Sequence, residues 1–513
     1  MIKIKNMFLA AGLGLLLAGC NKESYLNVNT NPNSLTSSTP EYVFTSGANR
    51  TAAIITPNET GEYWSGHWSQ STTYAYISAT FSYQFNNTNF NFWDTWYDVA
   101  QDFQYVIENA SAKGMPFFKG PAKVMKAYIF HQLVDCYGNV PYSDAFKGVA
   151  SVAPKFDDQK AIYEDLIKLL DEAIVDIKAN PFTGTFSSND IIFKGDRTKW
   201  VRFANTLKLR LLIRQSRIAG RDAYIIAEIN KILSSTTEGF LASGTGQDVG
   251  VNPGYVASAG QTNPIYNNWG YSETGSPRAL ARFPRPAKFL FDQMIALDDT
   301  FRLKRLAYAK GGEGSNTPGV SVQPELISNY VGVPFGSASG YLAQNTSYIG
   351  PSFVIKNQFN KDVILMTASE GFFLQAEAKQ LYGAAITLTG TAQSYYEQGV
   401  KESFRITGTD PAKALVLLTN GKNMTDWTAS TDKLKAIWFQ KWLALTNFSG
   451  LEAWSDYRRT NYPVTPASAG APATAKPNVR LFYPSTELGS NTANITAQGT
   501  IDVFTTRIFW DVD

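Results

Sequence analysis

Residues 121–142, PAKVMKAYIFHQLVDCYGNVPY, contain a helix, its end and the turn that follows it. Pro121 suits the first turn of a helix, because the amide hydrogen that proline lacks has no helical partner there. Gly138 favours the left-handed backbone conformation that ends many helices, and Pro141 prevents the helix from resuming. The stretch therefore predicts a helix from Pro121 to Asp135 and structural roles for Gly138 and Pro141.

Similar helical patterns occur along most of the chain. A helix over Trp93–Ala110 is expected to pair with the helix from Pro121. Apolar residues recur at helical spacing from Ile162 to Ile177, and Asn180-Pro181 ends that helix. Further apolar stripes predict helices over Trp200–Leu211, Ser369–Tyr382, Ala392–Phe404 and Lys433–Leu445. The predicted fold class is mainly α, with helix pairs that resemble tetratricopeptide repeats but lack their strict period.

Two long regions differ from these helices in composition. Residues 239–350 and 462–513 are rich in Gly, Asn, Ser, Pro and Tyr, and only Ala287–Leu297 predicts a clear helix there. Loops of such length inside a folded chain are usually functional or disordered. Because these are rich in aromatic residues, we expect packed, functional loops.

The composition excludes several classes of function. The chain has 513 residues, 44% of them hydrophobic, so two domains or one long superhelical domain can be formed. Its net charge of +3 is too small for the basic surface of a nucleic-acid-binding protein. Two cysteines and two histidines offer few ligands for a zinc site. No catalytic residue, metal or other cofactor is predicted.

The N-terminus predicts a lipoprotein signal peptide over residues 1–19. Lys3 and Lys5 precede an apolar run that is too short to span a bilayer comfortably. The run ends in LAGC (residues 17–20), which resembles a bacterial lipobox and predicts lipidation of Cys20. The alternative is an ordinary signal peptide followed by a chance cysteine. Residues 20–40 are too polar to pack and predict a tether, which leaves residues 41–513 as the ligand-binding domain.

Five blocks in the mature chain resemble the SusD/RagB family of nutrient-binding outer-membrane lipoproteins of Bacteroidetes, and they occur in the family's order. These blocks are YLNVNTNP (25–32), residues 127–142 with CYGNVPY, ANTLKLR (204–210), MTASE with LQAEA (366–370 and 374–378), and QKW with EAWSDYRR (440–442 and 452–459).

The resemblance implies a right-handed superhelix of tetratricopeptide-like helix pairs with long irregular loops. It implies a lipid-anchored protein at the cell exterior that captures an oligosaccharide, or in some members a peptide. It also implies a SusC-like, TonB-dependent transporter as the partner that receives this ligand. The family blocks do not identify the ligand, because substrates differ across the family.

Most of the polar and aromatic residues in these blocks are expected to be structural. Arg210, Arg214 and Arg217 predict an ion-paired or solvated helix face, and an anion site is the alternative. Asp456 lies beside two arginines, which would lower its pKa and make it a poor general acid. Core positions are expected for His131, Cys136, Trp93, Trp96, Trp438, Trp442 and Trp454.

Ligand contacts are predicted outside the long helices, because exposed rings stack on sugar faces while polar side chains bind the hydroxyl groups. Two segments combine these residue types. The first predicts contacts from Trp64, His67, Trp68 and Tyr74, and the second from Tyr266, Trp269 and Tyr271. Two structural alternatives exist: a short helix would turn Trp64 and Trp68 into a buried ridge, and Trp269 would fill a gap in its own loop.

Binding without catalysis is the main functional hypothesis. A lipid-anchored glycoside hydrolase would need two carboxylates roughly 5–10 Å apart at the ligand, and no motif pairs them. A tetratricopeptide-like scaffold that binds only protein is the third hypothesis, and the aromatic loops and family blocks favour it less.

Overall fold

The computed structural model describes residues 38–73, 78–311 and 322–512. The predicted signal peptide, Cys20, most of the tether and Tyr74 lie outside the described residues. Internal contacts divide the chain into Met1–Thr39 and Pro40–Asp513, and every element named below belongs to the second unit. None of the described helices combines the length and apolarity needed to cross a bilayer.

The described chain is mainly helical, as predicted. Its helices are α3 (Pro40–Ala53), α4 (Thr56–Trp64), α5 (Ser78–Ser82), α6 (Trp93–Asn109), α7 (Lys119–Tyr137), α8 (Gln159–Ala179), α9 (Arg197–Arg214), α10 (Asp222–Ser235), α11 (Pro264–Trp269), α12 (Lys288–Ala296), α13 (Thr300–Leu306), α14 (Ala368–Tyr382), α15 (Ala392–Thr407), α16 (Ala414–Leu418), α17 (Lys433–Leu445), α18 (Gly450–Thr460), α19 (Ser485–Ser490) and α20 (Thr492–Thr496). Its strands are β1 (Trp68–Gln70), β2 (Val249–Val251), β3 (Pro284–Pro286) and β4 (Val363–Met366).

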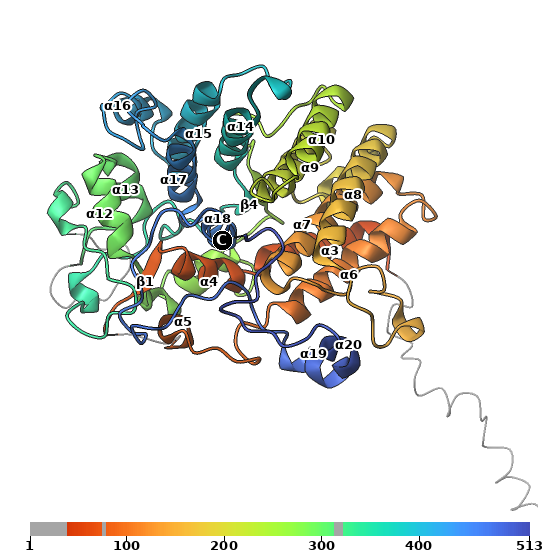
Figure 1. The fold of residues 1–513 in the computed structure, drawn as a ribbon, viewed down its shortest axis with the longest axis horizontal. Helices are drawn as coiled ribbons and strands as arrows, with labels where there is room; N and C mark the ends of the chain where they lie inside the picture. The colour runs from red at the N-terminus through yellow and green to blue at the C-terminus, as the bar shows by residue number, and fades with distance from the viewer. Residues whose placement is uncertain (1–37, 74–77, 312–321, 513) are drawn as a thin grey trace, which may run out of the picture. The chain divides into compact units, whose positions relative to one another are not determined.

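Helices that follow one another in the chain lie side by side. Contacts join α6 to α7, α7 to α8, α8 to α9 and α9 to α10, and a second group joins α14 to α15 and α17. Figure 1 shows these helices in one array, from α6 and α7 in orange to α15 and α17 in blue. This arrangement confirms the predicted helix pairs.

Local sequence explains where the predicted helices begin and end. The side chain of Asp158 accepts hydrogen bonds from the amides of Lys160 and Ala161 at the start of α8. Gly138 ends α7 with a φ of 75°, and its amide donates to the carbonyl oxygen of Val134. The prediction for residues 121–142 is therefore confirmed, with the helix slightly longer at both ends.

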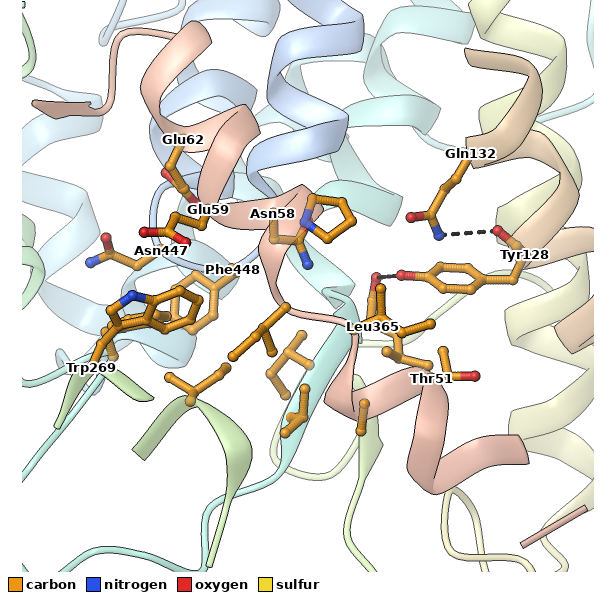
Figure 2. A pocket seen from close by; sticks show the side chains of 18 of the residues that line it. Thr51, Asn58, Glu59, Glu62, Tyr128, Gln132, Trp269, Leu365, Asn447 and Phe448 are labelled. Carbon is orange, nitrogen blue, oxygen red and sulfur yellow. Dashed lines mark hydrogen bonds between the residues drawn. The ribbon is translucent and has the colours of Figure 1, made fainter. Parts of the chain in front are cut away.

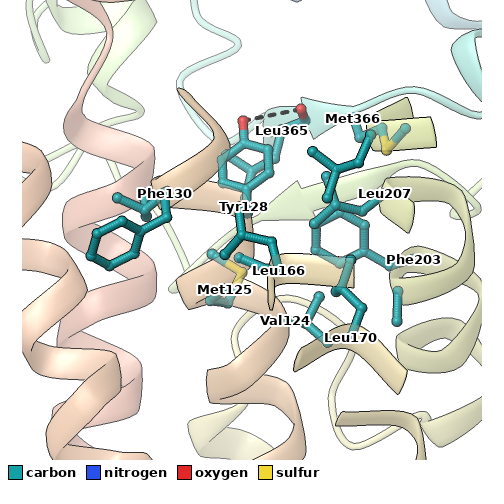
Figure 3. Packing of buried hydrophobic residues seen from close by; sticks show 14 of the residues in the cluster. Val124, Met125, Tyr128, Phe130, Leu166, Leu170, Phe203, Leu207, Leu365 and Met366 are labelled. Carbon is teal, nitrogen blue, oxygen red and sulfur yellow. Dashed lines mark hydrogen bonds between the residues drawn. The ribbon is translucent and has the colours of Figure 1, made fainter. Parts of the chain in front are cut away.

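The main hydrophobic core lies between α3 and α6–α9 and extends to β4. Figure 3 shows Tyr128 of α7 between side chains from the neighbouring helices, with its hydroxyl bonded to the carbonyl oxygen of Leu365 at 3.2 Å. His131 and Cys136 of α7 are buried, as predicted. Burial lowers the pKa of His131 to about 3 and raises the pKa of the Cys136 thiol. Trp93, Trp96, Trp442 and Trp454 are also buried, whereas Trp438 is partly exposed.

The prediction of only one clear helix within residues 239–350 is wrong, because α11 and α13 also form there. Leu303 and Leu306 of α13 belong to a cluster with Phe439 and Trp442 of α17. Short helices of this kind depend on tertiary packing, since their own propensity is insufficient.

The arginines of α9 are ion-paired inside the protein. Arg210 donates two hydrogen bonds to Glu370 of α14, each 2.7 Å long. Arg214 donates to Glu452 of α18 and, at 3.0 Å, to Asp456. Both arginine side chains are almost fully buried, so the solvated alternative is excluded for these two. Arg217 is half-buried and donates to the carbonyl oxygen of Arg459 at 2.6 Å.

Lys441 of α17 and Arg459 of α18 complete this ionic cluster. Lys441 of α17 lies 2.6 Å from Asp456, and Arg459 donates to Glu377 of α14 at 2.7 Å. Burial alone would raise the pKa of Asp456, but Lys441 and Arg459 outweigh it and lower the pKa. This confirms the prediction that Asp456 is a poor general acid.

Helices α4 and α18 cross at two glycines. A Cβ atom on Gly61 would lie 2.3 Å from the carbonyl carbon of Gly450, a distance that no real contact allows. The absence of both side chains lets the backbones touch. This contact fixes α4, which carries Glu59 and Glu62, against the ionic cluster.

Candidate ligand cavity

The two predicted ligand segments meet in space. The rings of Trp68 and Trp269 lie 6.0 Å apart and are almost perpendicular. Phe353 packs on both, 5.4 Å from Trp68 and 5.7 Å from Trp269. Strand β1, in the first segment, also pairs with β3. Because β3 follows the second segment in the chain, this pairing holds the two segments close together.

The expectation that residues 263–271 form a loop is wrong. Asn263 caps α11 by accepting from the amide of Tyr266, and Pro264 follows it in the first turn. Tyr266, Trp269 and Tyr271 are 3%, 6% and 2% exposed, respectively. Their rings pack on Phe353, Val354 and Phe359, so they form a wall and not an open stacking platform.

His67 is fully buried between α4 and α17. One ring nitrogen lies 2.7 Å from the Glu62 carboxylate, and the other lies 3.0 Å from the carbonyl oxygen of Trp442. Burial raises the pKa of Glu62, although His67 opposes this effect. Both ring nitrogens of His67 therefore have partners inside the protein. Trp64 and Trp68 are both buried, and Trp64 packs on Trp454, but the predicted helical ridge does not form because α4 ends at Trp64 and Trp68 lies in β1.

A cavity of about 360 Å³, here called the ligand cavity, lies beside α11 and within the size range of small-molecule sites. Half-buried Phe353 and Phe448, together with Tyr266, supply its aromatic surface. Its other polar lining residues are Thr245, Asp248, Asn263, Ser352, Gln358, Lys361, Asp362, Arg405 and Asn447.

The charged groups of the ligand cavity are held in defined positions. One guanidinium nitrogen of Arg405 donates to both oxygens of Asp248, at 2.8 and 2.6 Å. Burial raises the pKa of Asp248, against the influence of Arg405. Burial, followed by the charge of Arg305, lowers the pKa of Lys361 to about 8. Positively and negatively charged hydrogen-bonding groups thus surround the aromatic surface.

A smaller space, here called the inner chamber, lies behind the ligand cavity and has a volume of about 40 Å³. Figure 2 shows Trp269, Asn447, Glu59 and Glu62 at one end of it, and Tyr128, Gln132 and Thr51 at the other. Five residues line both spaces, which therefore adjoin one another: Ile265, Phe353, Ile364, Asn447 and Phe448.

Another hollow, here called the aromatic hollow, has a volume of about 270 Å³. It is lined by the six rings of Tyr63, Trp64, Tyr83, Phe289, Phe335 and Tyr457, and by several prolines. The paired side chains of Lys288 and Asp292 are its charged groups. It has fewer polar side chains than the ligand cavity and is smaller.

Sequence reasoning missed Phe353, Phe448 and Lys361. Residues 351–362, PSFVIKNQFNKD, combine aromatic, amide and charged residues, so the criterion used for the two predicted segments would also have selected this stretch. Phe448 directly follows a long predicted helix and carries no such signal. Within the described residues, no group of three His, Cys, Asp or Glu side chains could hold a metal ion.

A comparison with protein-family models shows to which family the chain belongs. The model of a SusD-like family, described as starch-binding and associating with the outer membrane, matches residues 30–484. The chain belongs to the SusD-like family.

Solved structures of SusD-like proteins share this fold. A SusD homolog from Bacteroides uniformis is 25% identical with a TM-score of 0.70, and the match covers 92% of this chain and 100% of that chain. A chitin-binding SusD homolog from Flavobacterium johnsoniae is 24% identical with a TM-score of 0.70, over 92% and 99% of the two chains. No curated protein sequence matches this SusD-like chain.

Proposed function

We propose that this SusD-like protein captures an oligosaccharide in the ligand cavity and delivers it to a SusC-like, TonB-dependent transporter, without catalysis. A peptide is the other ligand class considered. The proposal rests on one observation: the 360 Å³ cavity combines half-buried Phe353 and Phe448 with amide, carboxylate, lysine and arginine side chains. Rings that stack on sugar faces and polar groups that bind hydroxyls are what a glycan site requires.

The hydrogen bonds of the cavity carboxylates favour binding without hydrolysis. Asp248 is bound through both oxygens by Arg405, and Asp362 accepts from the side-chain amide of Asn252 at 2.8 Å. A glycosidase needs one carboxylic acid free to protonate the leaving oxygen. A protein-binding scaffold would not need a cavity with this mixture of rings and polar groups.

Replacing Phe448 with alanine is expected to weaken glycan binding by roughly five- to thirtyfold, equivalent to ~1–2 kcal/mol for one lost stacking ring. Calorimetry with maltohexaose, cellohexaose, chitohexaose and xylohexaose identifies the glycan that binds, and product analysis of the same mixtures detects hydrolysis. The matched control is Tyr457→Ala in the aromatic hollow, where we expect unchanged affinity. Loss of affinity in Tyr457→Ala alone would place the site in the aromatic hollow.

Lipidation of Cys20 is proposed to anchor the protein on the outer membrane, facing the cell exterior. Cys20→Ala is expected to move the protein from the membrane fraction to the soluble fraction, because two or more acyl chains are what makes such anchoring stable. Pull-down of the wild-type protein in mild detergent should recover the transporter. Full retention of the variant in membranes from which the transporter has been removed would contradict the anchor.

A further inference from the structure

Trp269 has a polar atom without a partner at the inner chamber. Its indole nitrogen is buried and makes no hydrogen bond within the described part of the chain. The neighbouring Trp68, by contrast, donates to the side-chain oxygen of Asn447 at 2.8 Å. Buried donors are nearly always satisfied, and an exception points to a water or ligand that completes the site.

The wall facing this nitrogen provides acceptors. Glu59 and Glu62, both on α4, line the inner chamber and are buried. Figure 2 shows the nitrogen edge of the Trp269 ring on the side of Glu59 and Asn447. A carboxylate has about four acceptor positions, so it can bind a further hydroxyl even where one oxygen is already bonded. One hydroxyl group here could accept from Trp269 and donate to a carboxylate.

The size of the inner chamber limits what can enter it. Its volume of about 40 Å³ corresponds to about three water molecules. This is too small for a sugar ring but large enough for a single carbon with its hydroxyl group. The ligand cavity next to it, at about 360 Å³, has room for the ring itself.

We infer that the inner chamber is a subsite for the hydroxymethyl group of a hexopyranose whose ring lies in the ligand cavity. The hydroxyl accepts a hydrogen bond from the indole nitrogen of Trp269 and donates one to Glu59. The inference rests on the proposed glycan function and adds a selectivity to it. Hexoses are bound in preference to the matching pentoses, which lack this group and leave Trp269 unsatisfied.

The inference is tested on the whole folded protein with monosaccharides, so the natural glycan need not be known. The protein is labelled with 5-fluorotryptophan, and the fluorine signal of Trp269 is assigned from its loss in Trp269→Phe. Should that variant not fold, the shift caused by Glu59→Gln assigns the signal. The probes are three pairs that differ only in the hydroxymethyl group: D-glucose and D-xylose, D-galactose and L-arabinose, D-mannose and D-lyxose.

At least one hexose is expected to shift the Trp269 signal at a concentration at least tenfold lower than its pentose partner. Glu59→Gln should reduce this preference, while Glu164→Gln on the surface should not. Equal shifts by hexose and pentose, or no shift with any hexose, overturn the inference. The hexasaccharide titrations with Phe448→Ala test the proposed function separately: a glycan that requires Phe448 but leaves the Trp269 signal unchanged removes the subsite and keeps the function.

Discussion

Glu452→Gln is expected to lower the free energy of unfolding by about 3–5 kcal/mol, the range for breaking a buried ion pair by removing one partner. Glu452 accepts from Arg214 and lies 3.5 Å from Arg210 and 3.3 Å from Lys441. The substitution keeps the size of the side chain but leaves three buried cations short of one negative charge. Urea unfolding monitored by circular dichroism measures the loss.

The matched control is Glu164→Gln, which also removes a carboxylate bonded to an arginine. Glu164 is 44% exposed and pairs with Arg221, so we expect a change of no more than about 1 kcal/mol. Similar losses in both variants would mean that the buried cluster is no more important for stability than a surface pair.

The loss in Glu452→Gln should also depend on pH. Burial alone would raise the pKa of Glu452, but Arg214, Arg210 and Lys441 together hold it well below its ordinary value. A carboxyl whose pKa is lower in the folded state stabilises the protein above its unfolded pKa, and this contribution disappears as the pH falls. The difference in the free energy of unfolding between wild type and variant should therefore be largest near neutral pH and should decrease below about pH 4.

Gly61→Ala is expected to destabilise the protein by about 3 kcal/mol or more, because the new methyl group meets backbone atoms that cannot move aside. Its Cβ would lie 2.3 Å from the carbonyl carbon of Gly450, so α4 and α18 would have to separate. Since α4 carries Glu59 and Glu62, the inner chamber would change shape as well. Thermal and urea unfolding measure the loss of stability.

Gly489→Ala is the matched control, because Gly489 also lies in a helix but has no atom within 4 Å of the new Cβ position. We expect its stability to stay within about 0.5 kcal/mol of wild type. An equally mild effect in Gly61→Ala would show that the two helices are not in the close contact described.

Local patterns in the sequence were sufficient for most of the long helices, although α3 and α10, with 14 residues each, were not predicted. The predicted helix over Lys433–Leu445 has the observed bounds, because Asp432 caps its start and the apolar stripe has helical spacing. Helix α18 was not predicted as a helix, since its sequence GLEAWSDYRRT is highly charged. Its charges are buried by partners far away in the chain, such as Arg214 for Glu452 and Glu377 for Arg459.

The sequence by itself determined the order of the helices, their capping residues and the family, because helix periods and caps involve residues only a few positions apart. It also selected Trp68 and Trp269, in two separate segments, as candidate ligand contacts. Only the tertiary structure decided that these rings are buried, that Phe353 packs against both of them and that Phe448 lines the ligand cavity. The solvent exposure of a side chain depends on contacts between segments hundreds of residues apart, and a local sequence pattern does not predict those contacts.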